Sequence, residues 1–253
     1  MSNTKKNKEK VKTTGDVTSK KNHLNKKSEG SGGDKVTRYI VIGMIALVLI
    51  AGVAATLAKK GSSSGASLPA QAAKSDGYGI SFNKSSKVKV DLFEDFRCPV
   101  CRDFEAANDQ YISGLVKSGK INAVYHPMHF IAPDSQLAAN AAACAADQGK
   151  FLEMHTALYV KQPTTAQSSE NSSYWNSTSL IQLGRDAGIA SPLFDSCVTS
   201  GKYLNWTGDI NNDASKKNIN STPTLLVNGK KVAQATVLDN KALTKLLATL
   251  GVK

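Results

Sequence analysis

The chain is poor in cysteine and in histidine. Its 253 residues include four of each, and the cysteines that lie close together are Cys98 and Cys101. A zinc ribbon needs two such pairs, so the lack of a second pair argues against a structural zinc site. Pro127 makes a regular helix improbable between His126 and His129, and no second cluster of carboxylates and histidines accompanies them. We therefore expect no metal ion and no other cofactor.

The first 38 residues almost completely lack large apolar side chains. They hold eleven basic and four acidic residues, a net charge of +7 out of +12 for the whole chain. So polar a segment cannot offset the entropy lost on ordering, and we predict that residues 1–38 are disordered. Because more than half of the excess charge sits in this tail, the overall charge does not indicate a nucleic-acid-binding domain.

Residues 39–58 contain no charged residue. Twenty helical residues span about 30 Å, the thickness of the hydrocarbon core of a bilayer, so a transmembrane helix is predicted. Basic residues are far denser before this segment than after it, which places the N-terminus in the cytoplasm and the rest outside. A cleavable signal peptide is the alternative, although its apolar region is usually about 7–15 residues long. In either case the remainder of the chain is exported, and in the first it is a single-pass membrane protein.

The composition changes again after the apolar segment. Residues 59–86 are rich in serine, glycine and alanine and predict a flexible linker. A folded domain is expected over residues 87–253, with strands and helices mixed as in α/β proteins. Asn228-Gly229 is a two-residue hairpin signal between the last two strands. The predicted strands are 87–93, 121–125, 224–227 and 231–237, and the predicted helices are 99–118, 135–146, 150–160, 180–187, 192–199, 204–217 and 238–250.

The segment Cys98-Pro99-Val100-Cys101 follows a predicted strand and begins a predicted helix. Proline is favourable in the first helical turn, where its missing N–H is not needed. Cys98 then lies at the helix N-terminus, where free N–H groups and the helix dipole favour a thiolate, the reactive form of cysteine. Cys101 lies one turn deeper. This arrangement predicts thiol–disulfide exchange, with a local structural disulfide as the alternative.

A second segment supports the redox interpretation. In Ser221-Thr222-Pro223-Thr224 a proline directly precedes an apolar strand, and alone it indicates only the start of that strand. Together with CPVC it resembles the cis-proline loop of the thioredoxin fold. Residues 87–250 are similar to the DsbA-like thiol–disulfide oxidoreductases, in particular to the actinobacterial, membrane-anchored kind. The resemblance is carried by EDFRCPVC (94–101), AAACAADQGKFLEMHTALYVKQ (141–162), Phe194 with Cys197, and STPTLLVNG (221–229).

The resemblance implies a thioredoxin fold with a helical insertion at about residues 130–217, preceded by the transmembrane helix. It makes Cys98 the exposed nucleophile and Cys101 its buried partner. It also implies that Pro223 is cis and close to this pair, and that Thr222 offers backbone hydrogen bonds to a bound peptide.

The chain departs from the family at two positions. Many members bury an acid six residues before the first cysteine, and here that position is Leu92. Asp91, Glu94 and Asp95 are nearby, and the sequence does not decide whether one of them assists proton transfer. The central dipeptide is Pro-Val, so the histidine of the enterobacterial CPHC is missing. A weaker oxidant is therefore expected.

Cys144 and Cys197 are the remaining cysteines, in two predicted helices. Two further cysteines in an exported domain favour a structural disulfide, and two buried free thiols are the alternative. The resemblance implies the disulfide.

The function predicted from these observations is that of an oxidase. It would donate the Cys98–Cys101 disulfide to exported polypeptides with reduced cysteines and be reoxidised by a membrane redox partner. A reductase or isomerase is the second hypothesis, but isomerases of this fold commonly dimerise through an extra domain, and residues 61–86 are too few to supply one. A monomer is therefore expected. A non-enzymatic binding or chaperone-like module is the third hypothesis.

Overall fold

The computed structural model describes residues 66–163 and 173–252, which belong to one compact unit that begins at Ser64. The predicted tail (1–38) and transmembrane helix (39–58) lie outside the described residues. No helix within the described ranges is long and apolar enough to cross a membrane.

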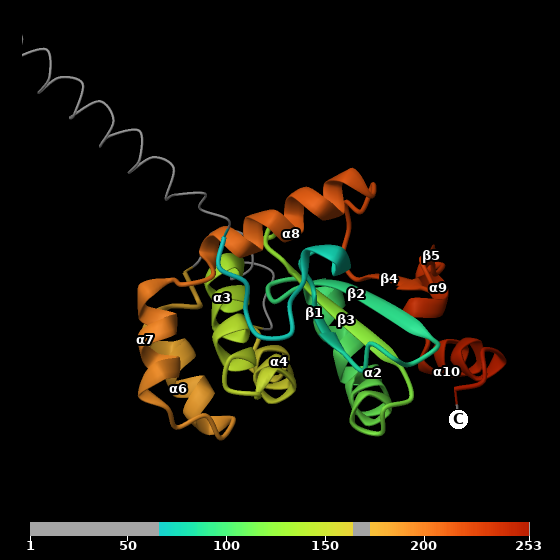
Figure 1. Ribbon diagram of the computed structural model, residues 1–253, viewed down its shortest axis with the longest axis horizontal. Helices are drawn as coiled ribbons and strands as arrows, with labels where there is room; N and C mark the ends of the chain where they lie inside the picture. Colours follow the sequence, from blue (N-terminus) through green and yellow to red (C-terminus); the bar gives the residue numbers. More distant parts are fainter. Residues whose placement is uncertain (1–65, 164–172, 253) are drawn as a thin grey trace, which may run out of the picture. The chain divides into compact units, whose positions relative to one another are not determined.

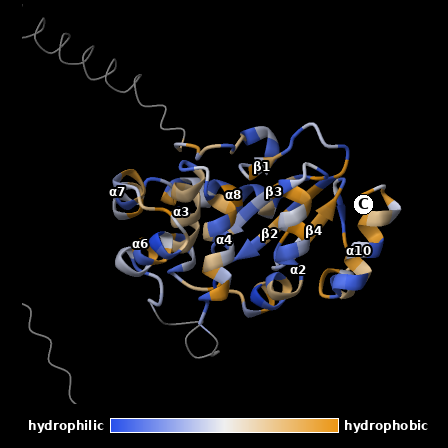
Figure 2. Cartoon of the chain, turned by 90° about the horizontal axis from the view of Figure 1, so that it is seen from below, coloured by the Kyte–Doolittle hydropathy of each residue, from blue (hydrophilic) through white to orange (hydrophobic). Residues whose placement is uncertain are grey.

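A five-stranded mixed sheet forms the centre of this unit (Figure 1). The strand order is β1-β3-β2-β4-β5, with β2 parallel to β3 and the other neighbours antiparallel. The central strand β2 is buried over six of its seven residues, and β4 is coloured as hydrophobic in Figure 2. The strands are β1 (Ile80–Phe82), β2 (Lys89–Asp95), β3 (Asn122–Met128), β4 (Thr224–Val227) and β5 (Lys230–Lys231).

Helices cover both faces of the sheet. In Figure 1, α2 (Pro99–Lys117) and α10 (Asn240–Thr249) lie below the strands and α8 (Leu204–Lys216) lies above them. The Asn240 side chain joins α10 to α2 by donating to the Ala107 carbonyl and to the Asn108 side chain. Side chains of β2 alternate between the two faces, so neighbouring residues of this strand enter different environments.

Four further helices form the insertion between β3 and α8. They are α3 (Ser135–Ala146), α4 (Phe151–Val160), α6 (Ser177–Asp186) and α7 (Pro192–Ser200). Alanine-rich α3 is buried on nearly all sides, because small side chains let α4, α6, α7 and α8 approach it closely. The predicted thioredoxin fold with a helical insertion is thus present, although α8 also packs on β3 and covers the sheet.

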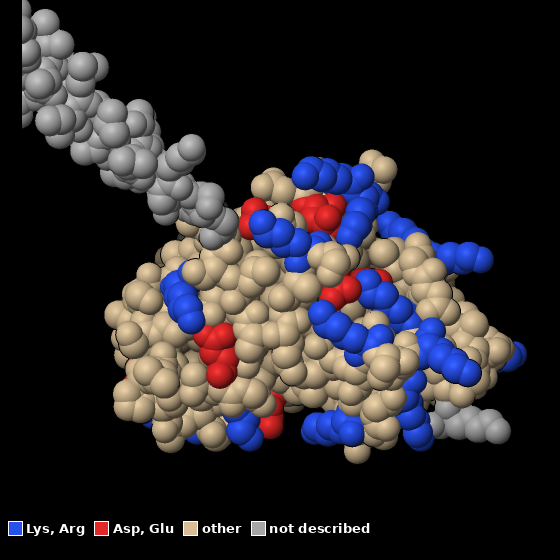
Figure 3. Space-filling view, in the orientation of Figure 1, with Lys and Arg blue, Asp and Glu red and all other residues tan. Residues whose placement is uncertain are grey.

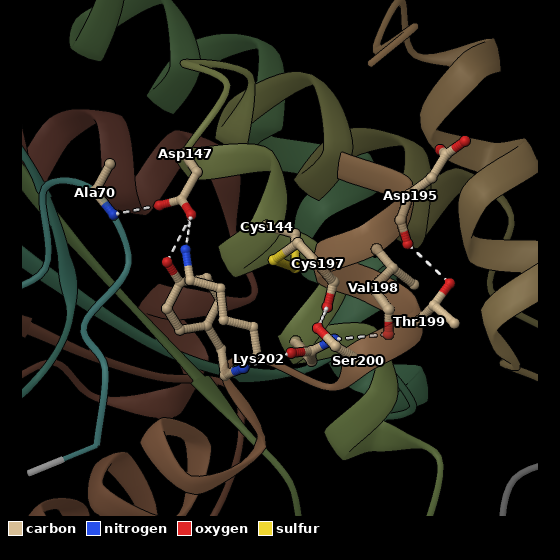
Figure 4. The surroundings of a disulfide bond; sticks show 11 residues. Ala70, Cys144, Asp147, Asp195, Cys197, Val198, Thr199, Ser200 and Lys202 are labelled. Atoms are coloured by element: carbon tan, nitrogen blue, oxygen red, sulfur yellow. Dashed lines mark hydrogen bonds and ion pairs between the residues drawn. A yellow bond between two sulfur atoms is a disulfide. The ribbon is translucent and has the colours of Figure 1, made fainter. Parts of the chain in front are cut away.

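A disulfide between Cys144 and Cys197 joins α3 to α7 (Figure 4). The two Cα atoms are 5.8 Å apart, and the bond closes a separation of 53 residues. Next to it, Asp147 accepts hydrogen bonds from the Ala70 N–H and the Lys202 ammonium. The structure therefore contains the disulfide that was expected.

Two sequence predictions were wrong. The segment 59–86 is not entirely a linker, because it contains a 3₁₀-helix (Lys74–Asp76) and the edge strand β1, which pairs with β3. The predicted strand 231–237 is limited to the two residues of β5, followed by the short helix α9 (Gln234–Val237). Alanine and glutamine in this segment favour a helix over a strand. The hairpin signal was correct, since Asn228 and Gly229 both have the positive φ angles of such a turn.

Basic side chains are numerous on the surface of this unit. Figure 3 shows many lysine and arginine side chains and few acidic ones on the face drawn there. Several acids on the surface pair with lysines, as Asp76 does with Lys84 at 2.9 Å. On the face drawn in Figure 3, basic side chains of the described residues therefore outnumber acidic ones.

Candidate active site

Cys98 occupies the N-cap position of α2, and Pro99 is the first helical residue. The Cys98 N–H donates to the Asp95 carbonyl, and the Cys98 carbonyl accepts from the Arg102 N–H as the helix begins. The sequence prediction for this helix start is confirmed. The Cys98 side chain is at the site of highest positive potential of the helix dipole.

The surroundings of Cys98 favour its thiolate. A hydrogen bond from the Cys101 thiol lowers the pKa of Cys98 to about 6, helped by the N–H groups of Val100 and Cys101 and opposed by burial. A pKa of about 6 means that most of the Cys98 side chains are ionised at pH 7. The resemblance implied an exposed Cys98, and this was wrong: the residue is buried, with 4% of its surface exposed, because the cis-proline loop packs against it.

Cys101 has the opposite character. It is completely buried, and burial raises its pKa well above the usual value, as do its hydrogen bond to Cys98 and the charge of Glu94. In the reduced protein Cys101 is therefore a thiol that donates to the Cys98 thiolate. The two sulfurs are unbonded in this structure.

The cis-proline loop closes the site from the other side. The Thr222–Pro223 peptide bond is cis, as the resemblance implied. The Thr222 carbonyl lies 3.5 Å from Cys98 Sγ, so the loop touches the reactive sulfur. A cavity of about 650 Å³ begins at Ser221 and Thr222 and continues along Val232 and Gln234. The structure thus brings together all four residues that were predicted for the active site.

Side chains of the insertion bind the segment between β2 and α2 that contains Cys98. The Gln162 amide donates to the carbonyls of Phe96 and Cys98 at 2.8 and 3.1 Å. The Arg97 guanidinium, which is 1% exposed, donates to the Asp134 carboxylate at 2.6 Å. Sequence reasoning missed Gln162 and Asp134. Each contact spans more than 35 residues of sequence and has no local signal.

A buried group of acids lies behind Cys101. Among the described residues, Glu94, Glu105 and His155 each place one ligand-type atom within 4.8 Å of the others. Burial raises the pKa of Glu94 to about 8, with further contributions from the charges of Cys98 and Asp109. Without a cation, this environment favours carboxyls that keep a proton. His155 packs in the core, as predicted, but its contact with Glu94 was not foreseen.

Comparison with known proteins gives one family and a consistent set of structures. A family model described as thioredoxin matches residues 81–247. Mtb DsbA in its oxidised form is 32% identical, with a TM-score of 0.51, covering 60% of this chain and 78% of that protein. DsbG of Mycobacterium tuberculosis, a disulfide bond oxidoreductase, is 31% identical with a TM-score of 0.51, covering 62% and 76%. MdbA of Actinomyces oris shares the fold at 22% identity, with a TM-score of 0.60 over 74% of this chain and 92% of that protein.

Curated sequences match a shorter part of the chain. The Na(+)/H(+) antiporter NhaA 1 of Mycolicibacterium gilvum is 30% identical over 141 residues, which are 55% of this chain and 21% of that protein. The chain thus spans about a fifth of the length of the curated relatives that it matches. The thioredoxin model, in contrast, matches about two-thirds of the chain, including CPVC and the cis-proline loop. The chain belongs to the thioredoxin family, in its group of DsbA-like thiol–disulfide oxidoreductases.

Proposed function

We propose that this protein is an extracytoplasmic disulfide oxidase that donates the Cys98–Cys101 disulfide to exported polypeptides. The observation that carries the proposal is the contrast between the two thiols, since the pKa of Cys98 is lowered to about 6 while that of Cys101 is raised. Stabilising the Cys98 thiolate stabilises the reduced enzyme. At pH 7 the lowered pKa stabilises the reduced enzyme by about 1 kcal/mol after solvent screening. This makes the reduction potential of the Cys98–Cys101 pair more oxidising by about 20 mV.

The geometry supports a two-step exchange. A substrate thiolate attacks Cys98 Sγ of the oxidised enzyme, and the S–S bond breaks as Cys101 leaves with the electron pair. A second substrate thiolate then attacks the substrate sulfur of the mixed disulfide. Cys98 leaves as a stable thiolate, and the substrate has lost two electrons to the enzyme. Because Cys98 is the partly accessible sulfur and Cys101 is fully buried, the attack goes to Cys98.

Glu94 supplies the proton that Cys101 needs. The leaving sulfur is created in a buried site where a thiolate is costly, so it must take up a proton as the disulfide breaks. The charge of Glu94 acts on the pKa of Cys101, and a pKa of about 8 keeps Glu94 protonated at neutral pH. Glu94 thus takes the place of the buried acid that the family carries at the position of Leu92, since both side chains lie on the same face of β2.

The substrate and the location follow from the same proposal. The Thr222 carbonyl beside Cys98 and the adjoining cavity suit an extended peptide next to its cysteine. The basic tail and the apolar segment 39–58 support a membrane-anchored protein whose catalytic domain faces outward. A membrane redox partner would then reoxidise it. Protease added to intact protoplasts should digest the C-terminal domain, and protection of that domain would contradict the location.

A reduction potential tests the oxidase against the reductase or isomerase. The full-length protein in detergent, equilibrated with glutathione buffers, should have a potential more oxidising than glutathione and should form disulfides in a reduced, unfolded protein. A potential well below that of glutathione would indicate a reductase. The Cys98→Ser variant should lose all activity. An active Cys98→Ser variant would contradict the role of Cys98, and a wild-type protein without exchange activity would favour the non-enzymatic binding module.

A further inference from the structure

The buried acids behind Cys101 form a chain of contacts that crosses three elements. Glu94 comes from β2, Glu105 from α2 and His155 from α4, and they are 3%, 5% and 2% exposed. His155 Nε2 lies 3.1 Å from Glu94 Oε2, and His155 Nδ1 lies 3.9 Å from Glu105 Oε2. The imidazole is thus within hydrogen-bonding distance of Glu94 at one nitrogen and faces Glu105 at the other, and the two carboxyls also share a hydrogen bond with each other.

These groups are suited to passing a proton. Burial lowers the pKa of His155, and burial together with the charge of Glu94 raises that of Glu105. A neutral imidazole carries a proton on one nitrogen and accepts one on the other, so it can connect two carboxyls. The other titratable groups that face this cluster are Cys98 and Cys101, Asp109, Tyr125 and Tyr159.

A cavity opens beside the same cluster. It has a volume of about 380 Å³ and is lined entirely from α2 and α4, with Glu105 among the lining residues. Asp109 lies at its wall and accepts a hydrogen bond from the Thr156 hydroxyl at 2.9 Å. The Tyr159 hydroxyl, also at this wall, has no hydrogen-bond partner among the described residues. The cavity is polar enough and large enough to hold water.

We propose that Glu105 and His155 form a proton exit that connects Glu94 to the cavity between α2 and α4. The proposal rests on the proposed exchange at Cys98. When the enzyme disulfide breaks, Cys101 leaves with the electron pair and takes the proton of Glu94. Glu94 regains a proton from Glu105, either through their shared hydrogen bond or by way of His155, and water in the cavity replaces the proton that Glu105 gives up. On reoxidation the proton of Cys101 leaves by the same path. The buried sulfur therefore exchanges protons with solvent without passing through the substrate-binding loop.

Blocking the mouth of the cavity tests this exit without touching the acids. Ala106 lines the cavity and is exposed, so Ala106→Phe should fill it. A route for protons changes rates and leaves the equilibrium alone. We expect reduction by glutathione and reoxidation by oxidised glutathione to slow by the same factor, about 10-fold, with an unchanged reduction potential. The matched control is Ala107→Phe, at an exposed position of the same helix that does not line the cavity.

Two substitutions test the relay itself. Glu105→Gln and His155→Asn should each slow the exchange about 10- to 100-fold at pH 7 and increase the solvent deuterium isotope effect. Their control is Asp91→Asn, on the other face of β2. The Asp91 carboxylate lies 3.1 Å from His126, the same distance as that between Glu94 and His155. Asp91→Asn should exchange at the wild-type rate.

The outcomes separate the two proposals. A wild-type protein that exchanges disulfides, with Ala106→Phe and Glu105→Gln as fast as wild type, would overturn the exit and leave the proposed function intact. Equal slowing by Ala106→Phe and Ala107→Phe would overturn it as well, since the cavity would then have no special part. A wild-type protein without any exchange activity would overturn both. Ala106→Phe changes only a surface residue, so the exit can be judged even if Glu105→Gln does not fold.

Discussion

The two cysteine pairs of this protein lie in one domain and have opposite surroundings. Cys144 and Cys197 come from two helices of the insertion, and their sulfurs are bonded inside the core. Cys98 and Cys101 come from one turn of α2, where the helix dipole, the cis-proline loop and the buried acids all act on the sulfurs. The Cys144–Cys197 bond fixes two helices to each other, whereas a bond between Cys98 and Cys101 would connect residues that the helix already holds together.

The comparison shows that a cysteine's function depends on the groups around its thiolate. A disulfide that closes a long loop stabilises the fold by restricting the unfolded chain. A pair three residues apart closes almost no loop, so its disulfide is readily exchanged for another. What decides the exchange is the stability of each thiolate, and here hydrogen bonds favour Cys98 while burial disfavours Cys101.

The largest expected effect separates the two members of the active pair. Cys101→Ser should form lasting mixed disulfides with substrate proteins, because the Cys98 thiolate still attacks disulfides in those proteins and the Cys101 thiol that would release the adduct is missing. Cys98→Ser should form none, since the remaining thiol is completely buried. Non-reducing gels of cells that express each variant measure this difference. Adducts on Cys98→Ser alone would reverse the assignment of the nucleophile.

The second effect concerns stability. Replacing Cys144 and Cys197 together with alanine should lower the free energy of unfolding by about 4 kcal/mol, since their disulfide closes a loop of 53 residues. For a domain of this size the melting temperature should fall by about 10 °C. Dithiol oxidation per folded molecule should stay near the wild-type value at low temperature. A loss of activity as large as that of Cys98→Ser would contradict the separation of the two pairs.

The sequence predicted the parts of the site that have local signals. A proline in the first helical turn predicts the position of Cys98, whereas the cis-proline loop at Thr222 was predicted from the family resemblance. The helices of the insertion were also predicted to within about three residues at each end. The bond between Cys144 and Cys197 depended on a family resemblance, since spacing alone does not choose between a disulfide and two thiols.

The remaining parts depend on contacts between distant segments. Glu94 was named as a nearby acid, but its contact with His155 joins residues 61 positions apart. Glu105 lies in a helix whose pattern of apolar residues does not mark it as buried. Alternation along β2 offered one usable signal, because Glu94 shares a strand face with Leu92, where the family places its acid. The strand predicted at 231–237 failed because the hairpin signal was extended into residues that favour a helix.

A smaller effect concerns the pH dependence of the reduced protein. Because the pKa of Cys98 falls from about 9 to about 6 on folding, the unfolded chain binds more protons between these values. The contribution of Cys98 to stability therefore rises with pH from about 6 to 9 and is lost below 6. At pH 7 it should be about 1 kcal/mol. Urea unfolding of the reduced protein and of Cys98→Ala, compared across this range, measures it. If the free energies of unfolding of the two proteins changed in parallel with pH, the pKa of Cys98 would not be lowered.

The smallest effect tests the missing histidine of the CPVC turn. Val100 is 41% exposed beside Cys98, so a histidine at this position fits without disturbing the core. A protonated imidazole there would stabilise the thiolate, and Val100→His should lower the pKa of Cys98 by about 0.5 unit, equivalent to about 0.7 kcal/mol at a solvated site. The ultraviolet absorbance of the thiolate measures the pKa directly. Val100→Gln is the control, since it adds a polar side chain without a charge. An equal shift in both variants would show that polarity, and not charge, acts on Cys98. A shift in Val100→His alone would show that the Pro-Val dipeptide keeps this enzyme a weaker oxidant than a CPHC protein.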